Sequence, residues 1–296
     1  MGIEIRGVYA ITATPFLENE DIDEASIDRM VEYSAKAGVA GLTILGVMGE
    51  AHKLSEGERM RVAERFAKAS AGRLGLVVGT SLPGVDPTVA LCRHAEGLGA
   101  RAAMVAPPSG LKTPEAILDF YRRVAQGTRL PIVVQDEPVT TGVLMPASLL
   151  IRIAREVPTA VYVKLEEAPT LPKITALREA LGDRVGIFGG LGGVYYLEEL
   201  QRGAVGIMTG FAYHEVLQEI YQRFVAGDRP GAAKIFYRWL PLIRYEAQPG
   251  IGLALRKEIL RRRGIIKHAT VRQPGPILDR VTLAELDQII RDMEQS

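Results

Sequence analysis

Lys164 is the residue best placed for covalent chemistry, because it lies inside the apolar segment 160–165. This segment is typical of a buried β-strand, in which alternate side chains share a face, so Lys164 and Glu166 point to the same side. A lysine inside an apolar strand is unfavourable unless it is paired or has lost its proton. A desolvated amine with a lowered pKa is also the nucleophile that Schiff-base formation with a carbonyl compound requires. A lysine at the strand's end, with its ammonium in solvent, would produce the same pattern.

Glu166 follows Lys164 by two residues, which along a strand separates the two side chains by about 6–7 Å. Two interpretations of this pair remain open. In one, the carboxylate acts as acid and base on a substrate held by the lysine. In the other, it only forms an ion pair, which would raise the pKa of the lysine and oppose its nucleophilicity. The two roles could alternate during turnover.

Short apolar runs rich in β-branched residues recur at intervals of roughly 30 residues, each followed by a helical pattern. The eight expected strands are 8–14, 41–46, 74–80, 102–106, 131–135, 160–165, 185–188 and 204–209. Eight alternations within about 210 residues predict an α/β fold, a closed (β/α)8 TIM barrel. The alternative is a doubly wound open sheet. That fold lacks support because residues 12–16, after the first strand, carry no glycine fingerprint.

After the eighth strand, the chain contains only helical patterns. We therefore expect a barrel over residues 1–225 and a C-terminal helical extension, packed on the barrel, over residues 226–296. A Ser-x-x-Glu capping box from Ser55 to Glu58 marks the start of one barrel helix. The densest basic run, 256–263, lies on a helical pattern, and we expect it to form a solvated or subunit-facing surface.

Composition excludes several classes of function. The 296 residues include 36 basic and 35 acidic ones, a net charge of +1, so no global field attracts nucleic acid or an acidic membrane. A single cysteine, Cys92, excludes an intrachain disulfide and a cysteine-cluster metal site, and the four histidines are scattered, so no metal is expected. Apolar stretches stay well short of the ~18 residues of a transmembrane helix. Residues 1–6 lack the features of a signal peptide, so we expect a cytoplasmic protein.

Several motifs together carry a family resemblance. They are Thr14-Pro15-Phe16, Gly46-x-x-Gly49-Glu50 after the second strand, Pro138 after the fifth, the strand-six lysine and the helical C-terminus. Over essentially its whole length the chain resembles the Schiff-base lyases that include dihydrodipicolinate synthase and N-acetylneuraminate lyase, pyruvate-dependent class I aldolases on this barrel. The resemblance implies that Lys164 attacks the keto group of a small-molecule 2-oxo acid. The resulting imine is an electron sink, and no metal or organic cofactor is implied.

The resemblance also implies a substrate site at the C-terminal ends of the strands. Backbone N–H groups around Gly46, Val47 and Met48 would bind the substrate carboxylate, although the family usually has two hydroxyl residues there. We expect Glu50 to brace this loop rather than to transfer protons. The glycine run that begins with Gly189 and Gly190 would make room for the carboxylate or polyol of the substrate, the alternative being a phosphate cradle.

The departures from the family are informative. Gln135 replaces a tyrosine whose phenol relays protons, and an amide can position a group but cannot act as acid or base. Thr140 stands near the place of an arginine of the synthase, and residues 106–110 lack a tyrosine that reaches a neighbouring subunit. A true dihydrodipicolinate synthase is therefore not expected. Glu166, with Glu137 as a second candidate on the face of Gln135, must supply the missing proton transfer.

A Lys-x-Glu pair with a non-tyrosine on strand five resembles the 2-keto-3-deoxy sugar acid dehydratases of this family. We expect a lyase that dehydrates, or cleaves by retro-aldol reaction, a 2-keto-3-deoxy sugar acid. The alternatives are an aldol-type synthase or lyase using pyruvate, and a non-catalytic 2-oxo acid binder. The lost hydroxyls favour the binder and the retained Lys164 opposes it. The family forms homotetramers of two dimers, and without the inter-subunit tyrosine a dimer is also possible.

Overall fold

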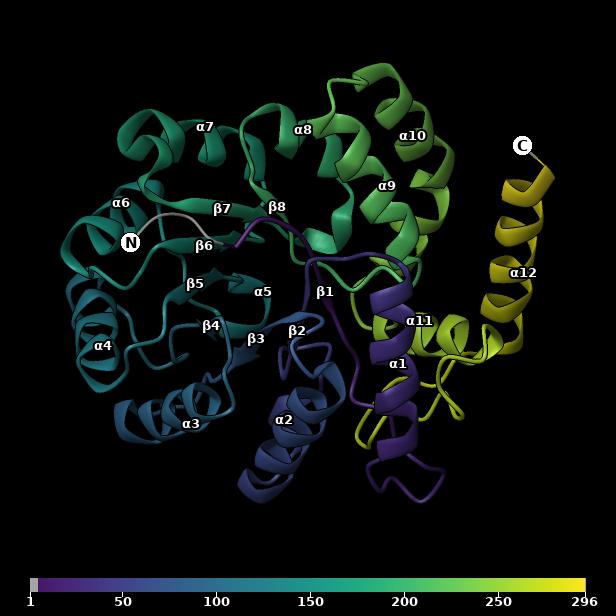
Figure 1. Ribbon diagram of the computed structural model, residues 1–296, viewed down its shortest axis with the longest axis horizontal. Coiled ribbons are helices and arrows are strands. Elements are labelled where there is room, and N and C mark those ends of the chain that lie inside the picture. Colours follow the sequence, from purple (N-terminus) through teal and green to yellow (C-terminus); the bar gives the residue numbers. More distant parts are fainter. Residues whose placement is uncertain (1–4, 296) are drawn as a thin grey trace.

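Eight parallel strands close into a barrel in the computed structural model, which describes residues 5–295 (Figure 1). Each strand pairs with the next in the sequence, and the eighth pairs with the first. The strands are β1 Gly7–Ile11, β2 Gly41–Ile44, β3 Gly75–Gly79, β4 Ala102–Val105, β5 Ile132–Asp136, β6 Tyr162–Leu165, β7 Gly186–Gly189 and β8 Gly206–Ile207. The predicted TIM barrel and all eight of its strands are confirmed. Residues 1–4, the start of the segment examined for a signal peptide, lie outside the described residues, as does Ser296.

Helices connect successive strands and form the outer ring seen in Figure 1. They are α1 Glu24–Lys36, α2 Glu56–Ser70, α3 Val85–Gly97, α4 Pro114–Gly127, α5 Pro138–Thr141, α6 Ala147–Glu156, α7 Thr170–Leu181 and α8 Tyr196–Gln201, with short 3-10 turns η1 Ala51–Lys53, η2 Gly182–Arg184 and η3 Leu191–Gly193. The predicted capping box at α2 is present, because Ser55 and Glu58 each accept a hydrogen bond from the other's backbone N–H.

Two apolar layers follow from the alternation of side chains along the strands. On β6, Val163 and Leu165 face the helices and belong to the large core between strands and helices. Tyr162 faces inward, into a second cluster that fills the barrel interior with residues such as Phe188. Lys164 lies on the same inward face as Tyr162, nearer the carboxyl end of the strand, and is only 2% exposed. The predicted burial of this lysine is confirmed.

Four helices follow the last strand: α9 His214–Val225, α10 Arg229–Glu246, α11 Gly252–Arg262 and α12 Arg280–Gln295. Helix α10 packs on α8, α9, α11 and α12, and in Figure 1 α12 stands at the edge of the molecule farthest from β4 to β6. The division into residues 1–225 and 226–296 remains our proposal. Within residues 5–295, no helix is both long and apolar enough to cross a bilayer.

The expectation that the basic run 256–263 forms a solvated or subunit-facing surface is wrong for its first two members. Lys257 is completely buried and Arg256 exposes 14% of its side chain. These two lie on the inward side of α11, where buried carboxylates pair with them, whereas Arg261 exposes 45% of its side chain. Composition alone does not reveal these partners, because Glu50 comes from a segment 207 positions away and Glu246 from the preceding helix, α10.

Candidate active site

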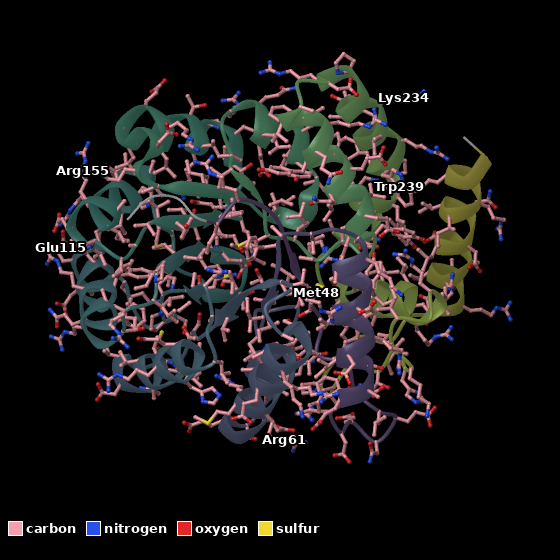
Figure 2. All side chains as sticks on the ribbon, in the orientation of Figure 1. Met48, Arg61, Glu115, Arg155, Lys234 and Trp239 are labelled. Atoms are coloured by element: carbon pink, nitrogen blue, oxygen red, sulfur yellow. The ribbon has the colours of Figure 1, made fainter. Side chains whose placement is uncertain are left out.

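A cavity of about 380 Å³ lies at the carboxyl ends of the barrel strands. Side chains that follow β2, β5 and β6 line one part of it, and α11 with its preceding loop lines another. In Figure 2, Met48 lies near the middle of the molecule, whereas the side chains of Arg61, Glu115 and Arg155 are at its periphery. The predicted residues that line the cavity are Val47, Met48, Gln135, Glu137, Lys164 and Glu166. Six of the nine predicted site residues thus share one space.

The pair formed by Lys164 and Glu166 is the shortest polar contact in this cavity. The lysine Nζ lies 2.6 Å from Glu166 Oε2. Gln135 is opposite Lys164 across the β5–β6 ladder, and its Nε2 donates to the same carboxylate oxygen at 3.0 Å. The ion pair that the spacing allowed is therefore present. A proton can pass across this contact, which would convert ammonium and carboxylate into a neutral amine and a carboxylic acid.

Glu137, the second acid/base candidate, begins the short helix α5. Its carboxylate accepts from the backbone N–H of Thr140 at 3.0 Å and 3.2 Å. Burial raises the pKa of Glu137, while the hydrogen bond from Thr140 lowers it. The side chain lines the cavity but is already engaged as a helix cap.

The loop after β2 contributes Val47 and Met48 to the cavity lining. Leu45 and Glu50, at the two ends of this loop, adopt left-handed backbone conformations with φ of 56° and 53°. Such residues persist only where the surroundings hold them. Within residues 5–295, the N–H groups of Val47 and Met48 donate no hydrogen bond. Their side chains offer no hydroxyl, so an anion at this loop would be bound through the backbone.

Glu50 holds the loop after β2 in place through buried contacts of its side chain. Its side chain is completely buried and contacts Lys257 Nζ at 2.5 Å and Lys53 Nζ at 3.0 Å. The backbone N–H of Arg272 donates to it at 3.0 Å. Phe16, from the Thr-Pro-Phe motif, contacts two cations of this cluster through its ring. Lys257 Nζ and Arg272 Cζ each lie 4.4 Å from the centroid of that ring. These contacts fit the bracing role expected for Glu50.

The glycines singled out as substrate-binding do not all line the cavity. Gly46 lines an adjoining cavity of about 340 Å³ that shares Val47 and Gln135 with the first. Gly189 and Gly190 line neither of the two. A Cβ at Gly190 would lie 2.4 Å from Glu166 Cγ. Gly190 thus makes room for Glu166, and its contact with substrate remains a prediction.

Among the lining residues that reasoning from the sequence missed, Arg256 is the one that carries a charge close to a buried carboxyl group, Glu246. Arg256 lines the cavity from α11, and its Nε lies 3.4 Å from Glu246 Oε2 at the end of α10. Burial raises the pKa of Glu246 to about 7, and Arg256 opposes that rise. The only available signal was that Arg256 lies next to the apolar face of a helix pattern containing Leu255 and Ile259, which does not identify a partner.

No group of three or more His, Cys, Asp or Glu side chains that could hold a metal ion lies within residues 5–295. The chemistry assembled in the cavity is that of an amine, carboxylates, an amide and a guanidinium. An amine paired with a carboxylate is suited to nucleophilic attack on a carbonyl group coupled to proton transfer.

The barrel, with its polar residues gathered at the carboxyl ends of the strands, defines a TIM-barrel enzyme. The sequence profile of the Dihydrodipicolinate synthetase family matches residues 4–293, and the chain belongs to this family. It is a lyase.

Three relatives show the range of similarity. An L-2-keto-3-deoxyarabonate dehydratase of Azospirillum brasilense is 32% identical over 98% of this chain and 94% of its own length. A 4-hydroxy-tetrahydrodipicolinate synthase of Methanothrix thermoacetophila is 30% identical over 81% of each chain. The crystal structure of a dihydrodipicolinate synthase from Rhodopseudomonas palustris, 36% identical, superposes with a TM-score of 0.93 over 98% of both chains. The family resemblance stated from the motifs is confirmed.

Proposed function

We propose that this protein dehydrates a 2-keto-3-deoxy sugar acid through an imine on Lys164. The observation that carries the proposal is the 2.6 Å contact between Lys164 Nζ and Glu166 Oε2 inside the cavity. The dehydratase activity named for the Azospirillum brasilense relative supports the same reaction class. The substrate of that relative is not transferred to this chain beyond the class of 2-keto-3-deoxy sugar acids.

In the proposed first step, Glu166 accepts the proton of the Lys164 ammonium, which leaves a neutral amine. The amine attacks the C2 carbonyl of the substrate, and one of its protons moves to the carbonyl oxygen. Glu166 then returns its proton to this oxygen, which leaves as water, so that a protonated imine forms and Glu166 is again a carboxylate. The substrate carboxylate binds the N–H groups of Val47 and Met48, two residues that line the cavity and whose N–H groups have no acceptor within residues 5–295.

In the second step, Glu166 in its carboxylate form removes a proton from carbon three and the imine becomes an enamine. The enamine electrons then form a double bond between carbons three and four, and the C4–O bond breaks. The leaving hydroxyl takes the proton from Glu166 and departs as water. Hydrolysis of the conjugated imine releases an unsaturated 2-oxo acid, which can rearrange to a semialdehyde, and restores Lys164.

Gln135 orients the carboxylate during these steps. Its Nε2 donates to Glu166 Oε2 at 3.0 Å, the same oxygen that contacts Lys164. Glu137 contributes negative charge at the cavity wall while it caps α5. Neither residue replaces a phenol that relays protons to an aldehyde, which is why dehydration is favoured over retro-aldol cleavage.

The test compares the purified protein with Glu166→Gln on a 2-keto-3-deoxypentonate. We expect one unsaturated or semialdehyde product without release of pyruvate. Because glutamine cannot carry the proton, Glu166→Gln should lower kcat by about 10²- to 10⁴-fold while an imine on Lys164 can still be trapped. Glu167→Gln is the matched control, since Glu167 pairs with Lys173 instead. Pyruvate plus an aldehyde as products would contradict the proposal.

We further propose a homotetramer built of two dimers, with a dimer as the alternative, in the cytoplasm. Support for an oligomer comes from the family and from large apolar side chains left exposed beside α5, at Val139 and Leu144. Molar mass by light scattering decides between the assemblies.

A further inference from the structure

Arg256 is a cation that lines the cavity and has no role in the reaction proposed above. It lines the cavity beside Lys164 and Glu166, and only 14% of its side chain is exposed. Its Nε is buried and makes no hydrogen bond within residues 5–295. The 3.4 Å contact of this atom with Glu246 Oε2 is an ion pair only, and no acceptor in that range takes a hydrogen bond from the terminal guanidinium nitrogens. A guanidinium carries five donors, and the buried, unpaired Nε is unfavourable, while the terminal nitrogens are left to bind a ligand.

The cation is held in place from one side. Glu246 is buried, and one of its oxygens also accepts from the backbone N–H of Ala212 at 3.2 Å. This bond anchors the carboxylate that faces Arg256. The guanidinium is therefore paired with an anchored carboxyl group, and the residue also lines the cavity. Arginine in such a position is suited to bind oxygen acceptors in a planar geometry.

Space for a ligand remains beside the guanidinium. Gly192 lines the cavity, and a Cβ placed on it would lie 3.6 Å from Arg256 Nη2. Gly250 and Gly252 line the same cavity. Of these three glycines, Gly250 borders open space, because no atom of the described residues would lie within 4 Å of a Cβ there. Lys164 and Val47 line the same cavity, and the proposed function assigns them to the keto carbon and its carboxylate.

We propose that Arg256 determines substrate specificity by binding oxygen atoms at the end of the substrate beyond carbon four. This inference rests on the proposed function, which places the keto end of the substrate at Lys164. The ligand chemistry is an oxygen acceptor on carbon five, supplied either by a hydroxyl group or by a second carboxylate. Glu246 is a positioning residue that acts through Arg256.

The experiment compares wild type, Arg256→Gln and Arg256→Lys with three 2-oxo acids. The tail is the part of the substrate beyond carbon four. Pyruvate has no tail, a 2-keto-3-deoxypentonate has a tail that ends in a hydroxyl group, and a 2-keto-3-deoxy aldarate has a tail that ends in a carboxylate. We expect Arg256→Gln to raise KM for the tailed acids by about ten- to a hundredfold, the effect of losing a charge-assisted hydrogen bond. Half-saturation of borohydride trapping with pyruvate should stay unchanged, which also shows that the variant is folded. Arg256→Lys should recover part of the loss.

Arg261→Gln is the matched control, because Arg261 lies on the same helix but pairs with Glu258 at the surface. If Arg256→Gln raises KM more for the aldarate than for the pentonate, Arg256 binds a carboxylate. If KM rises by a similar factor for both acids, Arg256 binds a hydroxyl group. Both results support the inference. An unchanged KM for both tailed acids, or an equal loss of pyruvate trapping in Arg256→Gln, would overturn this inference, while trapping by wild type would still support the imine on Lys164. Failure of wild type to form any adduct would overturn the proposed function, and this inference with it.

Discussion

One shared proton resolves the conflict between the two interpretations of Lys164 and Glu166. A carboxylate beside a lysine stabilises the ammonium, which is not nucleophilic. Because the two atoms lie 2.6 Å apart, the same carboxylate can also accept that proton when a carbonyl compound arrives. In our proposal the ion pair is the resting state and the acid/base role is the working state.

Gly190 controls where Glu166 lies. Gly190→Ala should displace this carboxylate, because the new Cβ would meet Glu166 Cγ at 2.4 Å. We expect kcat for dehydration to fall by at least about tenfold, since misplaced catalytic groups are costly, while Lys164 still forms an imine with pyruvate. Steady-state kinetics and intact mass measure the two effects.

The control for this substitution is Gly57→Ala, because nothing lies within 4 Å of a Cβ at that position on α2. Equal activity of Gly190→Ala and wild type would show that the position of Glu166 does not matter for turnover. Loss of the imine as well would point to a collapsed site instead of a displaced carboxylate.

At the scale of elements, the C-terminal helices complete the barrel's active end. Helix α11 contributes Lys257 to the brace of Glu50 and Arg256 to the cavity. The segment after it contributes Arg272, whose backbone N–H also binds Glu50. The left-handed loop that follows β2 is thus held by residues more than 200 positions away in the sequence.

Lys257→Met should destabilise the protein by about 3–5 kcal/mol, because it leaves the Glu50 carboxylate buried without its closest cation. Burial lowers the pKa of Lys257 to about 8, while Glu50 opposes the shift. The double variant Glu50→Gln/Lys257→Met should recover much of this loss. Denaturant unfolding at fixed protein concentration measures it. A cost below about 1 kcal/mol for the single variant, as for a surface pair, would contradict the bracing role.

The strands were predictable because each is a short apolar run between turn and helix signals, as buried parallel strands must be. Even β8, reduced to Gly206–Ile207, fell within its predicted segment. The role of α11 was not predictable. A basic run on a helix indicates a solvated face, and only the folded chain brings Glu50 and Glu246 to Lys257 and Arg256.

For the whole molecule, three buried carboxyl groups each contribute to the free energy of unfolding, and this contribution is larger at acid pH than at neutral pH. Burial raises the pKa of Asp136 to about 6 and those of Glu199 and Glu246 to about 7. Each raised pKa means that the folded state binds a proton more tightly than the unfolded state. Their contribution to the free energy of unfolding is therefore fully present below the unfolded pKa and is lost as the pH rises through the folded pKa.

Glu199→Gln isolates one of these groups. The carboxyl accepts from Thr170 at 3.0 Å through one oxygen, and its other oxygen has no hydrogen-bond partner among residues 5–295. Because glutamine is always neutral, the variant should gain stability over wild type as the pH rises from about 4.5 to about 7, by on the order of 3 kcal/mol. Unfolding curves at pH 5 and pH 8 measure the gain.

Glu179→Gln, at an exposed position of α7, serves as the control for Glu199→Gln. A stability difference between Glu199→Gln and wild type that does not change between the two pH values would show that Glu199 titrates alike in the folded and unfolded states.

Across the whole molecule, the sequence predicted the contact between Lys164 and Glu166, our proposed catalytic pair, better than the surroundings of the pair. Lys164 and Glu166 were found because a charged residue in an apolar strand is conspicuous. Gly190 was assigned to substrate, whereas its observed contact is with Glu166. Arg256 was assigned to solvent. Both differences concern packing between distant segments, which no local pattern encodes.

The measurement that tests the central proposal most directly is borohydride trapping with pyruvate, followed by intact mass and peptide mapping. We predict one reduced adduct per chain, located on Lys164 and absent from Lys164→Ala. Lys173→Ala is a useful comparison, because Lys173 is also a buried lysine but pairs with Asp136 behind the barrel wall, and it should still be labelled at Lys164. The absence of any adduct with pyruvate or with a small panel of 2-oxo acids, or an adduct on another lysine, would contradict the account.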